Sequence, residues 1–413
     1  MTTNQPGALA VRLYGKRIGV ITRLAGDRHL FAFDEAYVND NNRPTLSLSF
    51  KSSSGGLVTS VRPYNVRLPP FFSNLLPEGH LREYLAMRAG VKPGREFFLL
   101  AVLGVDLPGA ITVTAVDAAA DDDDHHHDSS ADRRDDARAA PLRFSLAGVQ
   151  LKFSAIMEAS GGLTIPADGI GGSWIVKLPS ARFEGVPENE ITMMELARSI
   201  GIPVPKVQRV PIKEIEGLPQ DAGKMEGHAL AVERFDRKPD GGRVHMEDFA
   251  QVFGVFPDDK YQKRSYANIA QVLAAEAGED GVNDFMRRLV FSVLIGNGDM
   301  HLKNWSLLYP DGRRPILAPA YDYVSTIAYL PNDQLGLSFG GSKRIDIITQ
   351  EQIARFADTA SLAFNSMWDI VEGTVYQTLE AWKKLDAKDV MTKAVREAME
   401  KHMQSVASSM KVS

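Results

Sequence analysis

The chain has 413 residues, of which 44% are hydrophobic and 24% charged, with a net charge of -5 and no cysteine. This length allows a sizeable core in two or three domains. Because the chain has no cysteine, it can form no disulfide, thiolate nucleophile or thiolate metal site. The net negative charge argues against a surface that as a whole binds nucleic acid. No apolar run reaches the roughly eighteen residues of a membrane span, and the first residues lack the order of a secretory signal. We therefore expect a cytoplasmic protein without a membrane partner.

Residues 1–114 are predicted to form a β-rich N-terminal subdomain. The stretches LAVRLYGKRIGVITRL and HLFAFDEAYV alternate or cluster β-forming residues and are interrupted by Gly, Asp and Asn. Later in this region, Pro and Gly bound two helical stretches, at about residues 78–88 and 97–103.

Residues 115–140 differ in composition from the rest of the chain. They read AVDAAADDDDHHHDSSADRRDDARAA and contain almost no large apolar side chain. Such a segment cannot bury enough surface to offset the entropy of ordering, so it is predicted to be a flexible acidic and histidine-rich linker.

After the linker, the pattern changes from strands to helices. Residues 141–235 contain the expected strands FSLAGVQLKFSAIM and SWIVKLP. A helix is predicted to begin at Pro187 and to end at Gly201, because acidic residues fill its first turn and apolar residues recur at three-residue steps. Residues 236–413 are predicted to be mainly helical, including the segments 351–384 and 388–410.

The segment GNGDMHLKNWSLL, residues 296–308, concentrates polar side chains behind an apolar run. Asp299 and Asn304 stand five positions apart, as in kinase catalytic loops, where the Asp orients the proton of the attacking hydroxyl and the Asn holds magnesium. A helix end capped by polar residues gives the same pattern. The motif alone leaves both interpretations open.

Charged residues elsewhere supply the other parts of a phosphotransferase. Asp322 in PAYDYVST follows in the position of a second metal-binding acid, and Lys177 in WIVKLP lies on a predicted strand, from which its ammonium can pair with phosphate oxygens. Glu190 or Glu195 of the next helix would supply the carboxylate that fixes the lysine. The lysine and the glutamates each have an ordinary alternative as solvated surface charges.

Together these motifs resemble the HipA family of serine/threonine kinase toxins from type II toxin–antitoxin systems. The resemblance rests on FSLAGVQLKFSA from Phe144, WIVKLP from Trp174, ENE at 188–190, AVERFDR from Ala231, GNGDMHLKNWSLL, PAYDYVST, and the N-terminal FFSNLLPEG and LLAVLGVDLPGAI. It implies an α+β, protein-kinase-like two-lobed fold: a HipA-like N-terminal subdomain (1–114), the linker, a small lobe with the phosphate loop (141–235) and a helical large lobe (236–413).

The resemblance also implies roles for individual residues. Asp299 would be the catalytic acid–base residue, Lys303 would neutralise the transferring phosphate, and Asn304 and Asp322 would bind Mg²⁺. Glu190 would pair with the ATP-contacting lysine. The implied ATP-binding residues are Ser145, Ala147, Gly148, Val149, Gln150, Lys152, Lys177, Glu233, Arg234, Phe235 and His301. At 233–235 the backbone is expected to contact adenine, and His301 is expected mainly to support the loop by hydrogen bonds.

The phosphate loop SLAGVQLK departs from ordinary protein kinases, because Gly148 is its only glycine and the G-x-G-x-x-G pattern is absent. The family resemblance implies that Ser145 is an autophosphorylation site. A phosphate there would add roughly two negative charges beside the triphosphate, so repulsion would inactivate the enzyme.

The resemblance implies a function and a set of partners. ATP and Mg²⁺ would be the cofactors, and a translation-related protein such as an aminoacyl-tRNA synthetase would be phosphorylated, which would inhibit growth. A DNA-binding HipB-like antitoxin would hold the toxin in check and would make most of the contact with operator DNA. Two alternatives stay open: a small-molecule or lipid kinase, since phosphate-handling residues do not identify the acceptor, and a non-enzymatic corepressor subunit that acts with the antitoxin.

Overall fold

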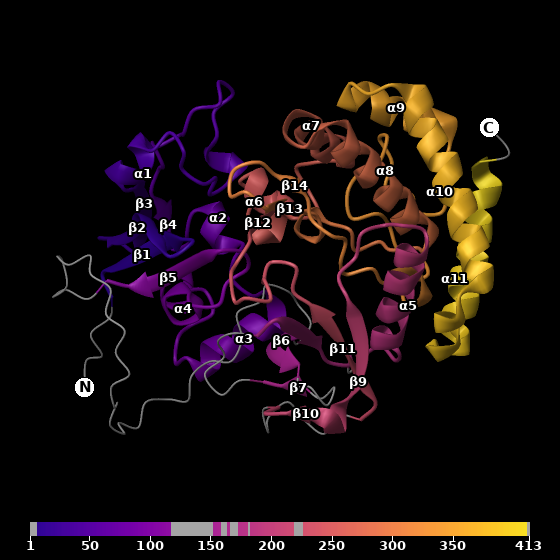
Figure 1. Ribbon diagram of the computed structural model, residues 1–413, viewed down its shortest axis with the longest axis horizontal. Coiled ribbons are helices and arrows are strands. Elements are labelled where there is room, and N and C mark those ends of the chain that lie inside the picture. The colour runs from indigo at the N-terminus through magenta and orange to yellow at the C-terminus, as the bar shows by residue number, and fades with distance from the viewer. Residues whose placement is uncertain are drawn as a thin grey trace.

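The computed structural model describes residues 6–116, 152–157, 163–165, 172–180, 182–218 and 226–410. Figure 1 shows the N-terminal subdomain at the left, a sheet-containing lobe at the lower centre and a helical lobe at the right. Most of the predicted linker and the phosphate-loop residues Ser145, Ala147, Gly148, Val149 and Gln150 lie outside the described residues.

The N-terminal subdomain is built on a five-stranded antiparallel sheet with the order β4-β3-β2-β1-β5. The two-residue hairpin between β1 and β2 uses Tyr14 and Gly15, both at positive φ (52° and 79°), which matches the right-handed twist of the strands. The strands are β1 (Ala8–Leu13), β2 (Lys16–Leu24), β3 (Arg28–Phe33), β4 (Tyr64–Asn65) and β5 (Ile111–Ala115).

Four helices accompany this sheet, and two of them fall where the sequence predicts helices. They are α1 (Glu35–Asn39), α2 (Pro70–Ser73), α3 (Gly79–Arg88) and α4 (Glu96–Leu103). The apolar core beneath them continues into the small lobe, because Phe153, Trp174 and Val176 belong to the same buried cluster as Leu9 and Phe97. The N-terminal subdomain is therefore packed onto the small lobe through a shared core.

The small lobe is a six-stranded sheet with the order β10-β7-β6-β8-β11-β9, flanked by helix α5 (Val186–Ser199), which packs on β9 and β11. All its strand pairs are antiparallel except β10 with β7. The strands are β6 (Lys152–Met157), β7 (Leu163–Thr164), β8 (Trp174–Lys177), β9 (Val207–Pro211), β10 (Ile215–Glu216) and β11 (His228–Glu233).

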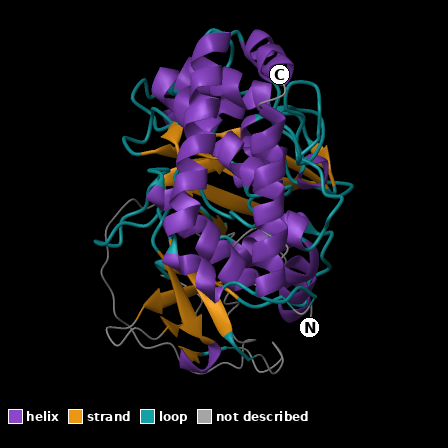
Figure 2. Ribbon diagram, turned by 90° about the vertical axis from the view of Figure 1, so that its right-hand side faces the viewer, coloured by secondary structure: helices purple, strands orange, loops and turns teal. Residues whose placement is uncertain are grey.

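The large lobe is mainly helical, and Figure 2, turned to face its outer side, shows helices in front of the strands. Its helices are α6 (Phe249–Val252), α7 (Tyr266–Glu276), α8 (Gly278–Leu294), α9 (Gln350–Ala360), α10 (Phe364–Lys384) and α11 (Lys393–Ser409). The predicted helical segment 351–384 is divided in two, because Ser361 adopts a left-handed conformation (φ 58°) that ends α9.

A small three-stranded sheet inside the large lobe is absent from the prediction. It consists of β12 (His245–Asp248), β13 (Ser306–Tyr309) and β14 (Ile316–Leu317) in that order. These strands have four residues or fewer, too short for a periodic pattern to stand out. β13 begins two residues after the GNGDMHLKN segment, so the sheet fixes one end of that loop.

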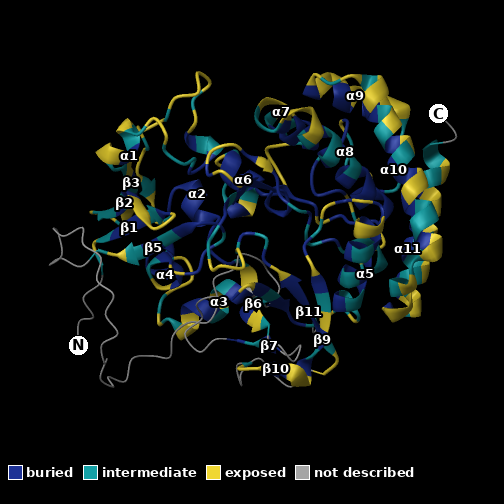
Figure 3. Ribbon diagram, viewed as in Figure 1, coloured by how far each residue is buried: buried dark blue, intermediate teal, exposed yellow. Residues whose placement is uncertain are grey.

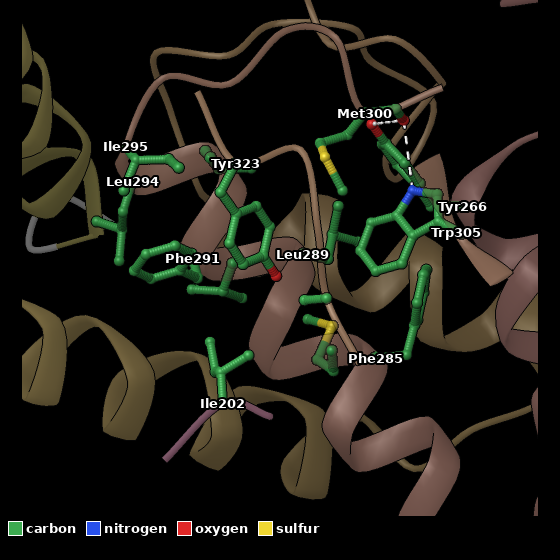
Figure 4. Close-up of a cluster of buried hydrophobic side chains, with 14 of the residues drawn as sticks. Ile202, Tyr266, Phe285, Leu289, Phe291, Leu294, Ile295, Met300, Trp305 and Tyr323 are labelled. Carbon is green, nitrogen blue, oxygen red and sulfur yellow. Dashed lines mark hydrogen bonds between the residues drawn. The ribbon is translucent and has the colours of Figure 1, made fainter. Parts of the chain in front are cut away.

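The core of the large lobe surrounds α8 and supports the same loop (Figure 4). The Phe285 and Trp305 rings meet edge to face at 4.6 Å, and the Tyr266 hydroxyl and the Trp305 indole N–H both donate hydrogen bonds to the backbone carbonyl of Met300, at 2.9 and 3.4 Å. Figure 3 shows α8 largely buried and much of α9 and α11 exposed. In the described ranges, no helix is both long and apolar enough to traverse a lipid bilayer.

Candidate active site

The loop that follows α8 is held in place by its backbone. Gly296 has φ 68°, and a Cβ at this position would run into the side chain of Ile327. Its carbonyl accepts hydrogen bonds from the Ile327 amide (3.0 Å) and from the Thr326 hydroxyl (3.1 Å). Together with the buried carbonyl of Met300, these contacts fix the backbone on both sides of Asp299.

Asp299 is presented at the surface of this fixed loop. Its side chain is 53% exposed, and one carboxylate oxygen accepts a hydrogen bond from the Tyr261 hydroxyl. Its backbone carbonyl accepts a hydrogen bond from Nδ2 of Asn304 (2.7 Å), so the two residues of the D-x-x-x-x-N motif are in contact. The protein packed around the carboxyl raises its pKa, while Tyr261 and Lys260 act in the opposite direction.

Asn297, which the sequence analysis did not select, joins the two acidic residues. This fully buried side chain accepts a hydrogen bond from the Asp299 amide (3.1 Å) and donates one to the backbone carbonyl of Asp322 (3.3 Å). Asp322 itself adopts φ 57°, an unfavourable conformation for a residue with a side chain, of the kind that clusters at functional sites. An Asn two positions before an Asp commonly accepts a hydrogen bond from the amide of that Asp, and this spacing was the sequence signal for the contact between Asn297 and Asp299.

A charged cluster lies where the two lobes meet. The Lys177 ammonium, on β8, contacts both Glu190 of α5 and Asp322, and Lys152 Nζ lies 3.3 Å from Asp322. Glu195, the other glutamate considered for Lys177, instead pairs with Arg198 on the helix surface. The structure thus brings a strand lysine, a helix glutamate and the second acid together.

Electrostatics favours the charged forms of Lys177 and Asp322 in this cluster. Burial favours the neutral form of Lys177, but Asp322 and Glu190 outweigh it, so the pKa of the ammonium is raised. Burial likewise opposes ionisation of Asp322, yet Lys152 and Lys177 hold the pKa of that carboxyl below its ordinary value. Burial, together with the nearby negative charge of Asp322, raises the pKa of Glu190 even though Lys177 acts in the opposite direction.

The donor set of Asn304 and Asp322 fits a magnesium ion. Asp322 is ionised and partly open to solvent (23% of its side chain), and the Asn304 amide nitrogen is used on Asp299, which leaves its oxygen as the available ligand. Mg²⁺ prefers such oxygen ligands and takes its remaining ligands from water and phosphate. Within the described ranges, no three His, Asp or Glu side chains are grouped to hold a metal.

Lys303 and His301 contact residues outside the Lys177 cluster. The Lys303 ammonium lies 2.6 Å from Glu78 of the N-terminal subdomain and donates to the carbonyl of Asn74 (3.1 Å). His301 is buried 3.9 Å from Asp299, and burial, reinforced by Lys260, lowers its pKa to about 3, so the imidazole is neutral. Its Nδ1 has no hydrogen-bond partner among the described residues.

The segment 233–235 ends β11. The amides of Glu233 and Arg234 donate to the carbonyls of Lys206 (2.9 Å) and Ser173 (2.8 Å). The Arg234 guanidinium is buried and pairs with Asp106 and Asp236 at 3.1 and 2.9 Å, so its side chain binds the protein itself. The amides of Glu233 and Arg234 and the side chain of Arg234 are thus all engaged within the protein.

Comparison with known proteins identifies the family. The HipA N-terminal domain matches residues 9–114, and the HipA-like C-terminal domain matches residues 144–406. The chain is 52% identical to the Y4dM protein of Sinorhizobium fredii (96% of this chain and 97% of the relative) and 29% identical to the serine/threonine-protein kinase toxin HipA of Shewanella oneidensis (71% and 72%).

The fold also matches a solved structure, the complex of Shewanella oneidensis HipA and HipB with operator DNA, with a TM-score of 0.72 and 22% identity over 97% of each chain. The likeness confirms the predicted α+β, two-lobed kinase-like fold. Since both HipA domain families match along its length, this chain belongs to the HipA family.

Proposed function

We propose that the protein is an ATP- and Mg²⁺-dependent serine/threonine kinase and the toxin of a toxin–antitoxin pair. The observation that carries this proposal is the contact of Lys177 with both Glu190 and Asp322, while Asn297 links Asp322 to Asp299. A helix end with capping residues would not require this set of charged partners from four separate segments. The names of the curated relatives agree with a kinase.

The side chains can divide the reaction as follows. Lys177 and Lys152 would neutralise phosphate oxygens of ATP, and Asn304 and Asp322 would hold Mg²⁺, which would shield the charge of the phosphates. Asp299 orients the acceptor hydroxyl and receives its proton through the half-exposed carboxylate. Because this carboxylate is open to solvent, an acceptor on another protein has access to it.

We further propose that the acceptor lies on a translation-related protein such as an aminoacyl-tRNA synthetase, and that a HipB-like antitoxin with operator DNA is the partner. The partner proposal is supported by the matched complex, which contains HipA, HipB and operator DNA. Autophosphorylation at Ser145 would switch the kinase off.

Incubation of the purified protein with labelled ATP and Mg²⁺, followed by mass spectrometry, tests the proposal. Label on a serine or threonine, lost in Asp299→Asn, is the expected result, with Ser145 as the expected position. A variant Asp299→Asn that still inhibits growth as the wild type does would instead favour a non-enzymatic corepressor. Label found on small molecules or lipids and on no protein would favour the other alternative.

A further inference from the structure

Glu78, in the N-terminal subdomain, connects that subdomain to the catalytic loop. It directly precedes α3, and its two carboxylate oxygens lie 2.6 Å from Nζ of Lys303 and 2.7 Å from Nζ of Lys260. The three side chains are largely buried, with exposures of 14%, 6% and 10% for Glu78, Lys303 and Lys260. One carboxylate thus binds two lysines of the large lobe.

Lys303 is connected to Asp299 through Asn304, its neighbour in the chain. Lys303 lies in the short 3₁₀ turn Leu302–Asn304, and the side chain of Asn304 donates to the carbonyl of Asp299 at 2.7 Å. The Lys303 ammonium also donates to the carbonyl of Asn74, so two residues of the N-terminal subdomain hold it. A shift of Lys303 would move the Asn304 side chain and the backbone of Asp299.

Lys260 is connected to Asp299 through different contacts, by way of Tyr261. The carbonyl of Lys260 accepts a hydrogen bond from the Leu302 amide at 3.2 Å. Its ammonium lies 5.5 Å from the centre of the Tyr261 ring, and the Tyr261 hydroxyl donates to the Asp299 carboxylate. Lys303 thus acts on the backbone of Asp299 through Asn304, and Lys260 acts on its side chain through Tyr261.

The charge of Glu78 is needed for this arrangement. Burial opposes its ionisation, but Lys303 and Lys260 outweigh burial and lower its pKa to about 2, so Glu78 is negative at neutral pH. Without that charge, two buried ammonium groups would face one another with no carboxylate between them, and such groups repel and seek water. The loop would then lose its fixed position.

We propose that Glu78 is a positioning residue of the active site, through which the N-terminal subdomain holds the catalytic loop for phosphoryl transfer. The activity expected of it rests on the kinase function proposed above. Its role is separate from that of the Lys177 cluster, because Glu78 contacts Lys303 and Lys260 and none of the residues of that cluster.

Glu78→Gln in the full chain tests the proposal, because it keeps the shape of the side chain and removes its charge. We expect kcat for phosphate transfer to fall roughly 10- to 100-fold, as misplaced catalytic groups typically cause, with an unchanged Kd for ATP measured without Mg²⁺. Glu78→Asp keeps the charge and should retain intermediate activity. Glu276→Gln is the matched control, because it removes another ion pair between the subdomain and the large lobe, Lys51–Glu276 at 2.7 Å, away from the loop; it should behave as the wild type.

Hydrogen exchange gives a readout that does not depend on activity. Amides of residues 296–305 should exchange faster in Glu78→Gln than in the wild type or in Glu276→Gln. Wild-type kcat together with wild-type exchange in Glu78→Gln would overturn the proposal, and if that variant does not fold, the same result in Glu78→Asp would do so. If the wild type transfers no phosphate, the kinase function fails, whereas faster loop exchange in Glu78→Gln would still support the positioning role.

Discussion

The Tyr261 hydroxyl donates a hydrogen bond to the carboxylate of Asp299, so a side-chain hydroxyl already occupies one oxygen of the acid that is expected to orient the acceptor hydroxyl. The Tyr261 ring also packs edge to face on His301 at 4.8 Å, which fixes the direction of that hydroxyl. Tyr261 therefore restricts the Asp299 side chain to one orientation and leaves its second oxygen for the substrate.

Tyr261→Phe should lower the rate of phosphate transfer about 5- to 10-fold, because a hydrogen bond to a charged group contributes roughly 1.5–3 kcal/mol and part of that orients the carboxylate. The affinity for ATP should not change, since Tyr261 contacts none of the residues around Lys177. Steady-state kinetics with ATP and with the protein acceptor separate the two effects. A wild-type kcat would show that the tyrosine has no orienting role.

Lys177→Met should abolish phosphate transfer and destabilise the fold. It leaves Glu190 buried without its cation, and breaking a buried pair in this way costs roughly 3–5 kcal/mol. Urea denaturation of the single and double variants measures this. Lys177→Met/Glu190→Gln should recover much of the lost stability but none of the activity; equal stability of the single and double variants would contradict the pairing.

Glu247 makes the contact between the N-terminal subdomain and β12 sensitive to pH. It accepts hydrogen bonds from the Ser47 hydroxyl, the Leu48 amide and the Tyr309 hydroxyl. Burial, with a smaller contribution from Asp248, nevertheless raises its pKa to about 7 from an ordinary value of 4.5. The folded state therefore holds a proton that the unfolded state releases between these pH values.

The free energy of unfolding should consequently fall as pH rises from about 5 to 8, by on the order of 3 kcal/mol from this residue. Chemical denaturation across this range, with Glu247→Gln as the comparison, measures the effect. The variant should lack this part of the dependence, because its amide stays neutral throughout. Parallel curves for the variant and the wild type would rule out Glu247 as the source.

Arg234→Ala should lower the stability of the protein and should have no direct effect on the binding of ATP. The guanidinium lies between Asp106 of the N-terminal subdomain and Asp236, and Ser154 of β6 donates to Asp106 at 2.9 Å. Its removal takes one cation from two buried carboxylates that Arg237 still contacts at 2.8 and 2.7 Å, so the cost should lie below the roughly 3–5 kcal/mol of an unpaired buried charge. In denaturation experiments, Arg344→Ala at the exposed Arg344–Asp346 pair should leave the midpoint unchanged. A weakened Kd for ATP with full stability would assign the Arg234 side chain to the nucleotide.

Site residues that belong to a motif with a fixed spacing could be predicted from the sequence. Asp299 and Asn304 are joined by a local hydrogen bond within one loop, so their five-residue spacing already encodes their contact. Strand periodicity located Lys177 on β8, and a helical pattern located Glu190 on α5. The order of these motifs along the chain then indicated the family.

Contacts between distant segments could not be predicted in the same way. Lys303 stands next to Asn304 in the sequence, yet its ammonium pairs with Glu78, a partner more than two hundred positions earlier. The position of Asn297 two residues before Asp299 is a local signal for its contact with the Asp299 amide, but its hydrogen bond to the carbonyl of Asp322 has no sequence pattern. Both depend on how the N-terminal subdomain and the segment around Asp322 pack on the loop, which no local propensity describes.

The central claim, that Lys177, Asp299, Asn304 and Asp322 serve one metal-bound nucleotide, is tested most directly by calorimetric titration of ATP with and without Mg²⁺. Asp322→Asn is a suitable probe, because Asn tolerates the left-handed backbone of this position. We predict that Mg²⁺ strengthens ATP binding to the wild type and to Asp299→Asn but not to Asp322→Asn. Full enhancement by Mg²⁺ in Asp322→Asn, together with undiminished phosphate transfer, would contradict the account.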